Sequence, residues 1–76
     1  MICDLVDVVY VYGNDWAGVY FNGVLVDEGH SVNWHYVMHK LVNKHILSFR
    51  EFEVDAEWLE VEGGMPPDLK SVVIAK

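Results

Sequence analysis

The pattern of apolar and polar positions divides the chain into short strands and helices. Residues 5–12 are β-branched or aromatic in composition and are interrupted by Asp7, which predicts a strand covered on both faces and placed centrally in a sheet. The turn residues Gly13, Asn14 and Asp15 follow it. We therefore expect the first strand to lie inside the sheet.

A β-hairpin is predicted around Asn22-Gly23. This dipeptide favours a type I′ turn, because both central residues of that turn take positive φ. Residues 16–21 and 24–27 on either side have strand composition. With a two-residue loop, the expected cross-strand pairs are Phe21 with Val24 and Val19 with Val26 on one face, and Tyr20 with Leu25, beside Trp16, on the other.

Both faces of this hairpin are apolar, and one of them is expected to cover the core. The other, which carries Trp16, Tyr20 and Leu25, is covered either by the C-terminal segment or by a second copy of the chain. We favour a homodimer, because two-fold pairing of one patch with itself is the commonest assembly.

A helix is predicted over residues 31–44, with Ser31 as its N-cap. The apolar stripe expected to pack on the sheet follows helical spacing and consists of Trp34, Val37, Met38, Leu41 and His45. Positive charge in the last turns, at Lys40 and Lys44, complements the helix dipole.

The C-terminal half predicts one more strand and a short helical turn. Residues 46–54 have strand composition, but the alternation slips between Phe49 and Phe52, which indicates a bulge. Asp55 is the expected N-cap of a helical turn over residues 56–61, and Gly63-Gly64 ends that turn. Residues 71–76 form either a last strand or a frayed tail.

These elements predict an α+β fold over residues 1–76 as one domain. In it, a small antiparallel sheet with the Asn22-Gly23 hairpin packs on the main helix of residues 31–44. The chain has 76 residues, of which 53% are hydrophobic, so its composition is that of a globular domain.

The charge and the cysteine content limit the kinds of binding partner and the cellular location that we expect. Twelve acidic residues against five basic ones give a net charge of −7, which disfavours direct binding of nucleic acid or of an anionic membrane. The apolar runs are too short for a membrane span, and the first residues lack the positive charge of a signal peptide. The single cysteine, Cys3, is expected to be a buried small hydrophobe. We expect a cytoplasmic protein.

A metal site is one hypothesis, because the chain has four histidines within sixteen residues: His30, His35, His39 and His45. His35 and His39 stand at i, i+4, a spacing that lets two imidazoles share a metal ion. The glutamate that follows the first histidine in zinc peptidases is replaced here by Tyr36. A metal-dependent enzyme built on His30, His35 and His39 is our third hypothesis, after two kinds of binding protein, and its alternative is a pair of histidines on a surface helix.

Catalytic motifs are otherwise lacking in the sequence. Its serines, Ser31, Ser48 and Ser71, have capping or strand positions, and neither a nucleophile elbow nor a phosphate-binding glycine loop occurs. We therefore assign no catalytic residue, no metal ligand and no cofactor.

The sequence is rich instead in aromatic and acidic residues of the kind found at binding surfaces. Large aromatic side chains exceed what one small core encloses, and an acidic stretch runs from Glu51 to Glu62 without a lysine or arginine. A negative surface beside aromatic anchors suits a basic protein partner. The residues expected to bind a partner are Trp16, Tyr20, Leu25, Glu53, Glu57, Trp58 and Glu60. A solvated acidic face that serves solubility alone is the alternative.

Two segments resemble small uncharacterised proteins of phages and bacteria. The first runs from Trp16 through Asn22-Gly23 to Ser31, in the pattern W-x-G-x-Y-x-N-G-x-L-V-x-E-G-H-S, and the second covers residues 54–69. The resemblance implies a phage-encoded accessory or anti-defence protein in a host cytoplasm, and it brings no catalytic residues.

Two functions of different classes follow as hypotheses. The first is a non-enzymatic binding protein that blocks or adapts a macromolecular partner through the aromatic patch and the acidic face. The second is a small-molecule binder, such as a sponge for a nucleotide signal, with bases stacked on Tyr12, Trp16 or Trp34 between subunits.

Overall fold

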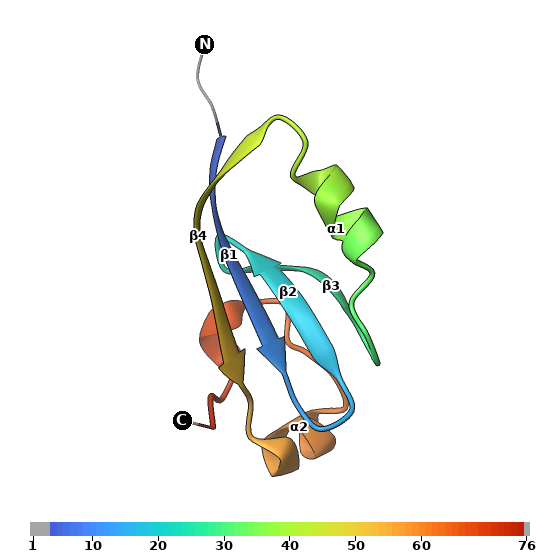
Figure 1. Ribbon diagram of the computed structural model, residues 1–76. Helices are drawn as coiled ribbons and strands as arrows, with labels where there is room; N and C mark the ends of the chain where they lie inside the picture. The colour runs from blue at the N-terminus through green and yellow to red at the C-terminus, as the bar shows by residue number, and fades with distance from the viewer. Residues whose placement is uncertain (1–3, 76) are drawn as a thin grey trace.

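The computed structural model describes residues 4–75, in which four strands and two short α-helices form an α+β fold (Figure 1). The elements along the chain are β1 (Asp4–Tyr12), β2 (Ala17–Phe21), β3 (Val24–Gly29), α1 (Trp34–Lys40), β4 (Lys44–Glu53), α2 (Ala56–Glu62) and a 3₁₀ turn (Leu69–Ser71). Cys3, for which burial was expected, and Lys76 lie outside the described residues.

The sheet is mixed, so the expectation of a wholly antiparallel sheet was wrong. Its strand order is β3-β2-β1-β4, with β1 and β2 antiparallel, β2 and β3 antiparallel, and β1 and β4 parallel. The chain reaches β4 from β3 through α1, which carries it from one edge of the sheet to the other. A crossover of this kind delivers a strand parallel to the one it joins.

The hairpin turn is confirmed, and its register differs in one place. Asn22 and Gly23 have φ of 51° and 86°, as a type I′ turn requires. The predicted pairs Tyr20 with Leu25 and Phe21 with Val24 are present. Val19 pairs with Asp27 instead of Val26, because a bulge shifts the register. The Asp27 carboxylate then accepts a hydrogen bond from the Asn33 backbone N–H, 2.9 Å away, just before α1.

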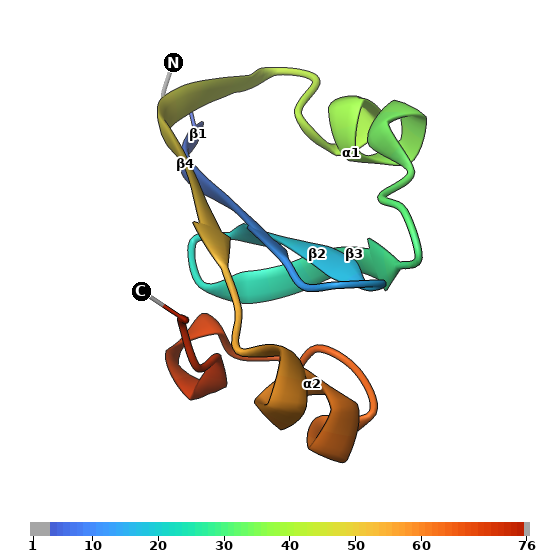
Figure 2. The same ribbon diagram turned by 60° about the horizontal axis from the view of Figure 1, so that its bottom comes forward.

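The strand β1 is buried on both faces, as its composition predicts. On one face a core cluster includes α1, and on the other a second cluster includes the C-terminal segment. The buried members of the first are Val6, Val8, Ala17, Val19, Val32 and Val37. Those of the second are Val9, Val11, Tyr20, Val54, Leu59 and Met65. In Figure 2 the sheet lies between α1 on one side and α2 with the C-terminal turn on the other.

The helix α1 is shorter than the predicted 31–44 and begins later. Its N-cap is Asn33 and not Ser31, because the Asn33 side chain accepts the hydrogen bond from the Tyr36 backbone N–H at 3.1 Å. Of the expected apolar stripe, Val37 is fully buried and Leu41, just beyond the helix, is half-buried, whereas Met38 is 57% exposed. His45 belongs to β4.

The strand β4 carries the predicted bulge at a different place. The register with β1 shifts between Val6, which pairs with Ile46, and Asp7, which pairs with Ser48, so Leu47 is the extra residue. Beyond it, Phe49 pairs with Val8 and Phe52 with Val11. Because partners in a parallel ladder share a face, the two phenylalanines lie on opposite faces, which explains the slip in the alternation.

The C-terminal segment begins with α2, whose boundaries follow the predicted signals. The Asp55 side chain accepts a hydrogen bond from the Trp58 backbone N–H at 3.1 Å, and Gly63 ends the helix with φ of 79°. Residues 71–75 form no full strand, but Ile74 makes a single antiparallel bridge with Val54. None of the helices between residues 4 and 75 has the length and apolar character to cross a membrane.

Replacement of Val37 by alanine tests how α1 is held. Val37 is the buried residue of α1, and loss of two buried methyl groups is expected to lower the free energy of unfolding by about 2 kcal/mol. The matched control is Met38→Ala on the exposed side of the same helix, expected to change it by less than about 0.5 kcal/mol. Urea unfolding measures both, and equal effects would show that α1 is not anchored through Val37.

Candidate functional site

Three of the residues predicted to bind a partner face the chain's own C-terminal segment. Tyr20 is fully buried, and Trp16 and Leu25 are partly buried against the same cluster. The segment also pairs with backbone of both outer strands: Leu25 N–H donates to the Pro67 carbonyl at 3.0 Å, and Ala75 N–H donates to the Glu53 carbonyl at 2.8 Å. We call residues 56–75 the C-terminal strap.

Tyr20 fixes the middle of the strap. Its hydroxyl donates a hydrogen bond of 2.6 Å to the Pro66 carbonyl. Burial raises the pKa of Tyr20, and the negative charges of Glu28 and Asp68 raise it further, so the hydroxyl keeps its proton and acts as a donor.

Glu28 makes the second attachment between the hairpin and the strap. Its Oε1 accepts hydrogen bonds from the Trp16 indole N–H at 2.9 Å and from the Met65 backbone N–H at 2.8 Å. The Glu28 carboxylate therefore orients the Trp16 indole and also binds the strap at Met65. Neither long-range contact has a local signal in the sequence.

The face that carries Trp16, Tyr20 and Leu25 is therefore covered within the chain itself. Of the two covers that the sequence left open, the structure shows the C-terminal strap in place over this face. Trp58 is likewise half-buried and packs on the same cluster. Glu53, Glu57 and Glu60, by contrast, are exposed.

The hydrogen bond from Tyr20 to the strap predicts the effect of removing its hydroxyl. In Tyr20→Phe the Pro66 carbonyl loses its donor, and the free energy of unfolding is expected to fall by about 1–2 kcal/mol. Tyr36→Phe removes a hydroxyl from an exposed ring on α1 and serves as the control, with a change within about 0.5 kcal/mol. Denaturant unfolding compares the two, and a neutral Tyr20→Phe would argue that the bond does not hold the strap.

Glu57 and Glu60 border a cleft between α2 and the turn that joins β1 to β2. Its volume is about 340 Å³, and it is lined by Asn14, Asp15, Ala56, Glu57, Leu59 and Glu60. The carboxylates of Asp15, Glu57 and Glu60 thus line one hollow together with the side chains of Ala56 and Leu59. We call this the acidic cleft.

Gly13 brings the two walls of the acidic cleft together. A Cβ at this position would lie 2.5 Å from Leu59 Cδ2 and 3.2 Å from Val54 Cγ2, so a side chain here would push the turn away from α2. The Gly13 N–H also donates to the Trp16 carbonyl at 2.7 Å, which closes the turn. The sequence marks Gly13 as a turn residue, but the approach of α2 follows from the tertiary fold.

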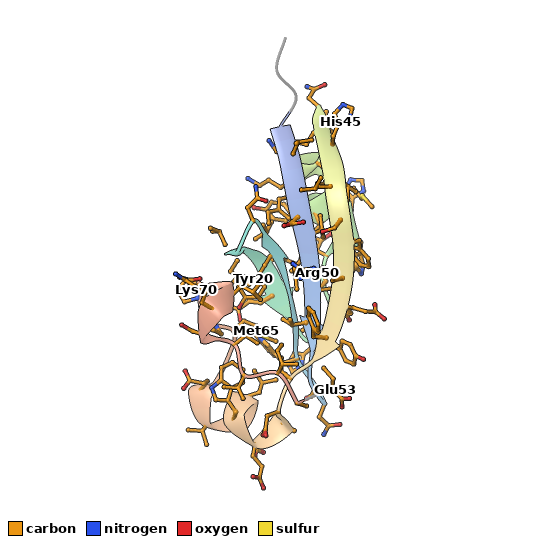
Figure 3. All side chains as sticks on the ribbon, turned by 90° about the vertical axis from the view of Figure 1, so that its left-hand side faces the viewer. Tyr20, His45, Arg50, Glu53, Met65 and Lys70 are labelled. Carbon is orange, nitrogen blue, oxygen red and sulfur yellow. The ribbon has the colours of Figure 1, made fainter. Side chains whose placement is uncertain are left out.

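Charge is distributed unevenly along the molecule, whose longest extent is 44 Å against 21 and 17 Å for the others. The acidic cleft lies at the end formed by α2, whereas Lys40 ends α1 near the other end (Figure 1). Along β4, Figure 3 places His45 near the start, Arg50 in the middle and Glu53 at the end beside the strap. Lys40 and Arg50 therefore lie away from α2, whereas Lys70 lies on the strap itself, in the 3₁₀ turn (Figure 3).

The histidines do not assemble as the metal hypothesis requires. His35 and His39 pack edge to face on α1, with ring centroids 4.8 Å apart. His30 instead packs on Trp16, at 4.9 Å, and its Nδ1 lies 3.6 Å from an Asp15 carboxylate oxygen. Within residues 4–75, no three His, Cys, Asp or Glu side chains come together in a group able to hold a metal ion.

Two of the three aromatic residues proposed to stack on a nucleotide belong to one row. Tyr12 stacks on Tyr10 with ring centroids 5.5 Å apart, and Tyr10 contacts Trp34 at the same distance. Trp34 is 39% exposed at the end of this aromatic row. Trp16 packs with the strap cluster, on the other face of the sheet.

Comparison with known protein families, with curated proteins and with solved structures found no match to this chain.

Proposed function

We propose that this chain is a non-enzymatic binding protein that engages a basic macromolecular partner through the acidic cleft and the glutamates around it. The observation that carries the proposal is the lining of the cleft, which brings the carboxylates of Asp15, Glu57 and Glu60 together with the side chains of Ala56 and Leu59. The aromatic residues have an indirect role: they pack against the strap, of which α2 is the first part.

A lysine or arginine side chain has the chemistry that such a cleft accepts. Its aliphatic stem packs on apolar atoms, while its charged end meets carboxylates. The acidic cleft provides both kinds of surface within one hollow, and α2 together with Glu53 extends the negative charge beyond it. A basic side chain projecting from a partner surface would therefore be the point of attachment.

Long-range electrostatics supports the same proposal. A net charge of −7 attracts a basic partner before contact, and the uneven distribution orients it toward the end that carries α2. Blocking a basic functional surface in this way fits the accessory or anti-defence role that the sequence resemblance implies, with the host cytoplasm as its setting.

Charge reversal tests whether the acidic cleft itself is used. Glu57→Lys with Glu60→Lys removes two attractive charges and adds two repulsive ones, so the affinity for a peptide of alternating lysine and alanine is expected to fall about tenfold or more. Fluorescence titration at low and moderate salt gives the Kd, and the wild-type affinity should weaken as salt rises.

The control for this test is Glu62→Lys. Glu62 is exposed at the end of the same helix but does not line the cleft. A loss as large as that of the double variant would indicate binding by net charge alone, and unchanged affinity in the double variant would exclude the acidic cleft as the binding site.

The aromatic row gives a specific reason to keep nucleotide binding as the second candidate. A base stacked on exposed Trp34 would extend the row formed by Tyr12, Tyr10 and Trp34. A nucleotide at about 100 times its Kd is expected to raise the Tm by on the order of 10 °C for a domain of this size.

Thermal-shift measurements with cyclic and linear nucleotides test this candidate. The shift should be absent in Trp34→Ala and retained in Tyr36→Ala, a neighbouring exposed ring outside the row. If no nucleotide raises the Tm of the wild-type chain, or if Trp34→Ala responds as the wild type does, the aromatic row is not a nucleotide site.

A further inference from the structure

Two histidines of α1 have the spacing of ligands that share one zinc ion. His35 and His39 lie four positions apart on the helix, both are exposed, and their ring centroids are 4.8 Å apart. In a tetrahedral site, two imidazole nitrogens that bind zinc at about 2.1 Å lie about 3.4 Å apart, which places the ring centroids about 5 Å apart. The pair therefore needs little rearrangement to bind one ion.

One chain supplies only two ligands at this position. Among the side chains of residues 4–75, no further His, Cys, Asp or Glu joins the pair to make a group of three. Structural zinc sites have four protein ligands and catalytic ones have three. An ion held by His35 and His39 therefore leaves two positions for ligands from outside the chain.

The surface around the pair is suited to contact with another molecule. His35, Met38, His39 and Val42 line one hollow of about 190 Å³, and Met38 and Val42 are 57% and 61% exposed. Their spacing is that of a stripe by which a helix packs on a neighbour. This stripe is separate from Val37, through which α1 is buried on the sheet. The helix thus presents a second packing surface, outward from the core.

The charge near the pair is compatible with a divalent cation. The ammonium group of Lys40 lies 5.4 Å from the centre of the Tyr36 ring. Tyr36 and Lys40 each follow one of the histidines by one position, so they lie along the neighbouring flank of the helix. The cation–π contact keeps the lysine charge on that flank. The net charge of −7 attracts cations to the molecule as a whole.

We propose that His35 and His39 bind a zinc ion together with the same two residues of a second copy of this chain. A two-fold axis through the ion repeats the pair and gives four imidazole ligands, the number that a tetrahedral zinc ion takes. Met38 and Val42 of both copies then pack beside the ion and are covered. The site is complete only in the dimer.

This dimer leaves the acidic cleft of each copy open. The cleft is at the end of the molecule that α2 forms, and α1 lies toward the other end (Figure 1). Zinc binding at α1 and partner binding at the acidic cleft are therefore separate properties, and each can be removed without the other.

Analytical ultracentrifugation of the full chain, without a histidine tag, measures the effect of zinc on its mass. Zn²⁺ is expected to convert the wild type from monomer to dimer, and EDTA should reverse the change. Mg²⁺ at the same concentration carries the same charge but prefers oxygen ligands, so it should leave the monomer unchanged. Isothermal titration calorimetry should give one zinc ion per two chains.

Substitution of the ligands tests where the zinc ion binds. His39→Gln removes one ligand from each copy, so the dissociation constant of the zinc-bound dimer is expected to rise about a hundredfold or more. His35→Gln should have the same effect. The matched control is His45→Gln, which removes an exposed histidine from β4 and should leave the dimer unchanged. Circular dichroism checks that each variant is folded.

The double variant Glu57→Lys with Glu60→Lys separates this site from the acidic cleft. Both glutamates line the cleft, so their loss should leave the zinc-dependent dimer intact. Loss of the dimer in this variant would place the zinc ion at the carboxylates and would overturn the proposal.

Three further results would also overturn it. The first is a wild type whose mass is unchanged by Zn²⁺, or changed no more than by Mg²⁺. The second is a stoichiometry of one zinc ion per chain, because the remaining ligands would then not come from a second copy. The third is a zinc-dependent dimer that persists in both His35→Gln and His39→Gln.

Discussion

Burial of β1 on both faces is the constraint on which the rest of the structure depends. Val6 and Val8 need a cover on one side and Val9 and Val11 on the other, so one helix layer is not enough for this sheet. A chain of 76 residues has little material for two layers. It provides α1 for the first layer and uses about its last quarter, as the C-terminal strap, for the second.

The need for a second layer explains why polar contacts are concentrated where the strap meets the hairpin. An irregular segment carries backbone groups that require partners once water is removed. Glu28 accepts from the Met65 N–H, and the Tyr20 hydroxyl donates to the Pro66 carbonyl, so two hairpin side chains satisfy adjacent residues of the strap. The strap includes α2, whose Glu57 and Glu60 supply two of the carboxylates of the acidic cleft.

Several local signals in the sequence predicted local features, although the N-cap of α1 is Asn33 and not Ser31. Asn22-Gly23 and Gly63 specify positive φ, and Asp55 specifies a cap, because each acts on its own backbone or on residues a few positions away. Features that depend on distant contacts were missed. The alternation in β4 is compatible with either strand direction, and the burial of Tyr20 depends on Pro66 far along the chain. The sequence placed Glu57 and Glu60 in an acidic stretch. It did not predict that they share a cleft with Asp15, because that depends on the packing of the turn at Gly13 against α2.

The parallel pairing of β1 with β4 has a consequence for the order of folding events. The hairpin of β2 and β3 closes a short loop and forms from neighbouring residues, on a timescale of roughly microseconds for isolated hairpins. The ladder between β1 and β4 joins Val8 to Phe49 and encloses the hairpin and α1 in one large loop. Loop-closure entropy opposes this step, so we expect the ladder between β1 and β4 to form later than the hairpin. The native topology is complete only once that ladder has formed, because it places β4 beside β1.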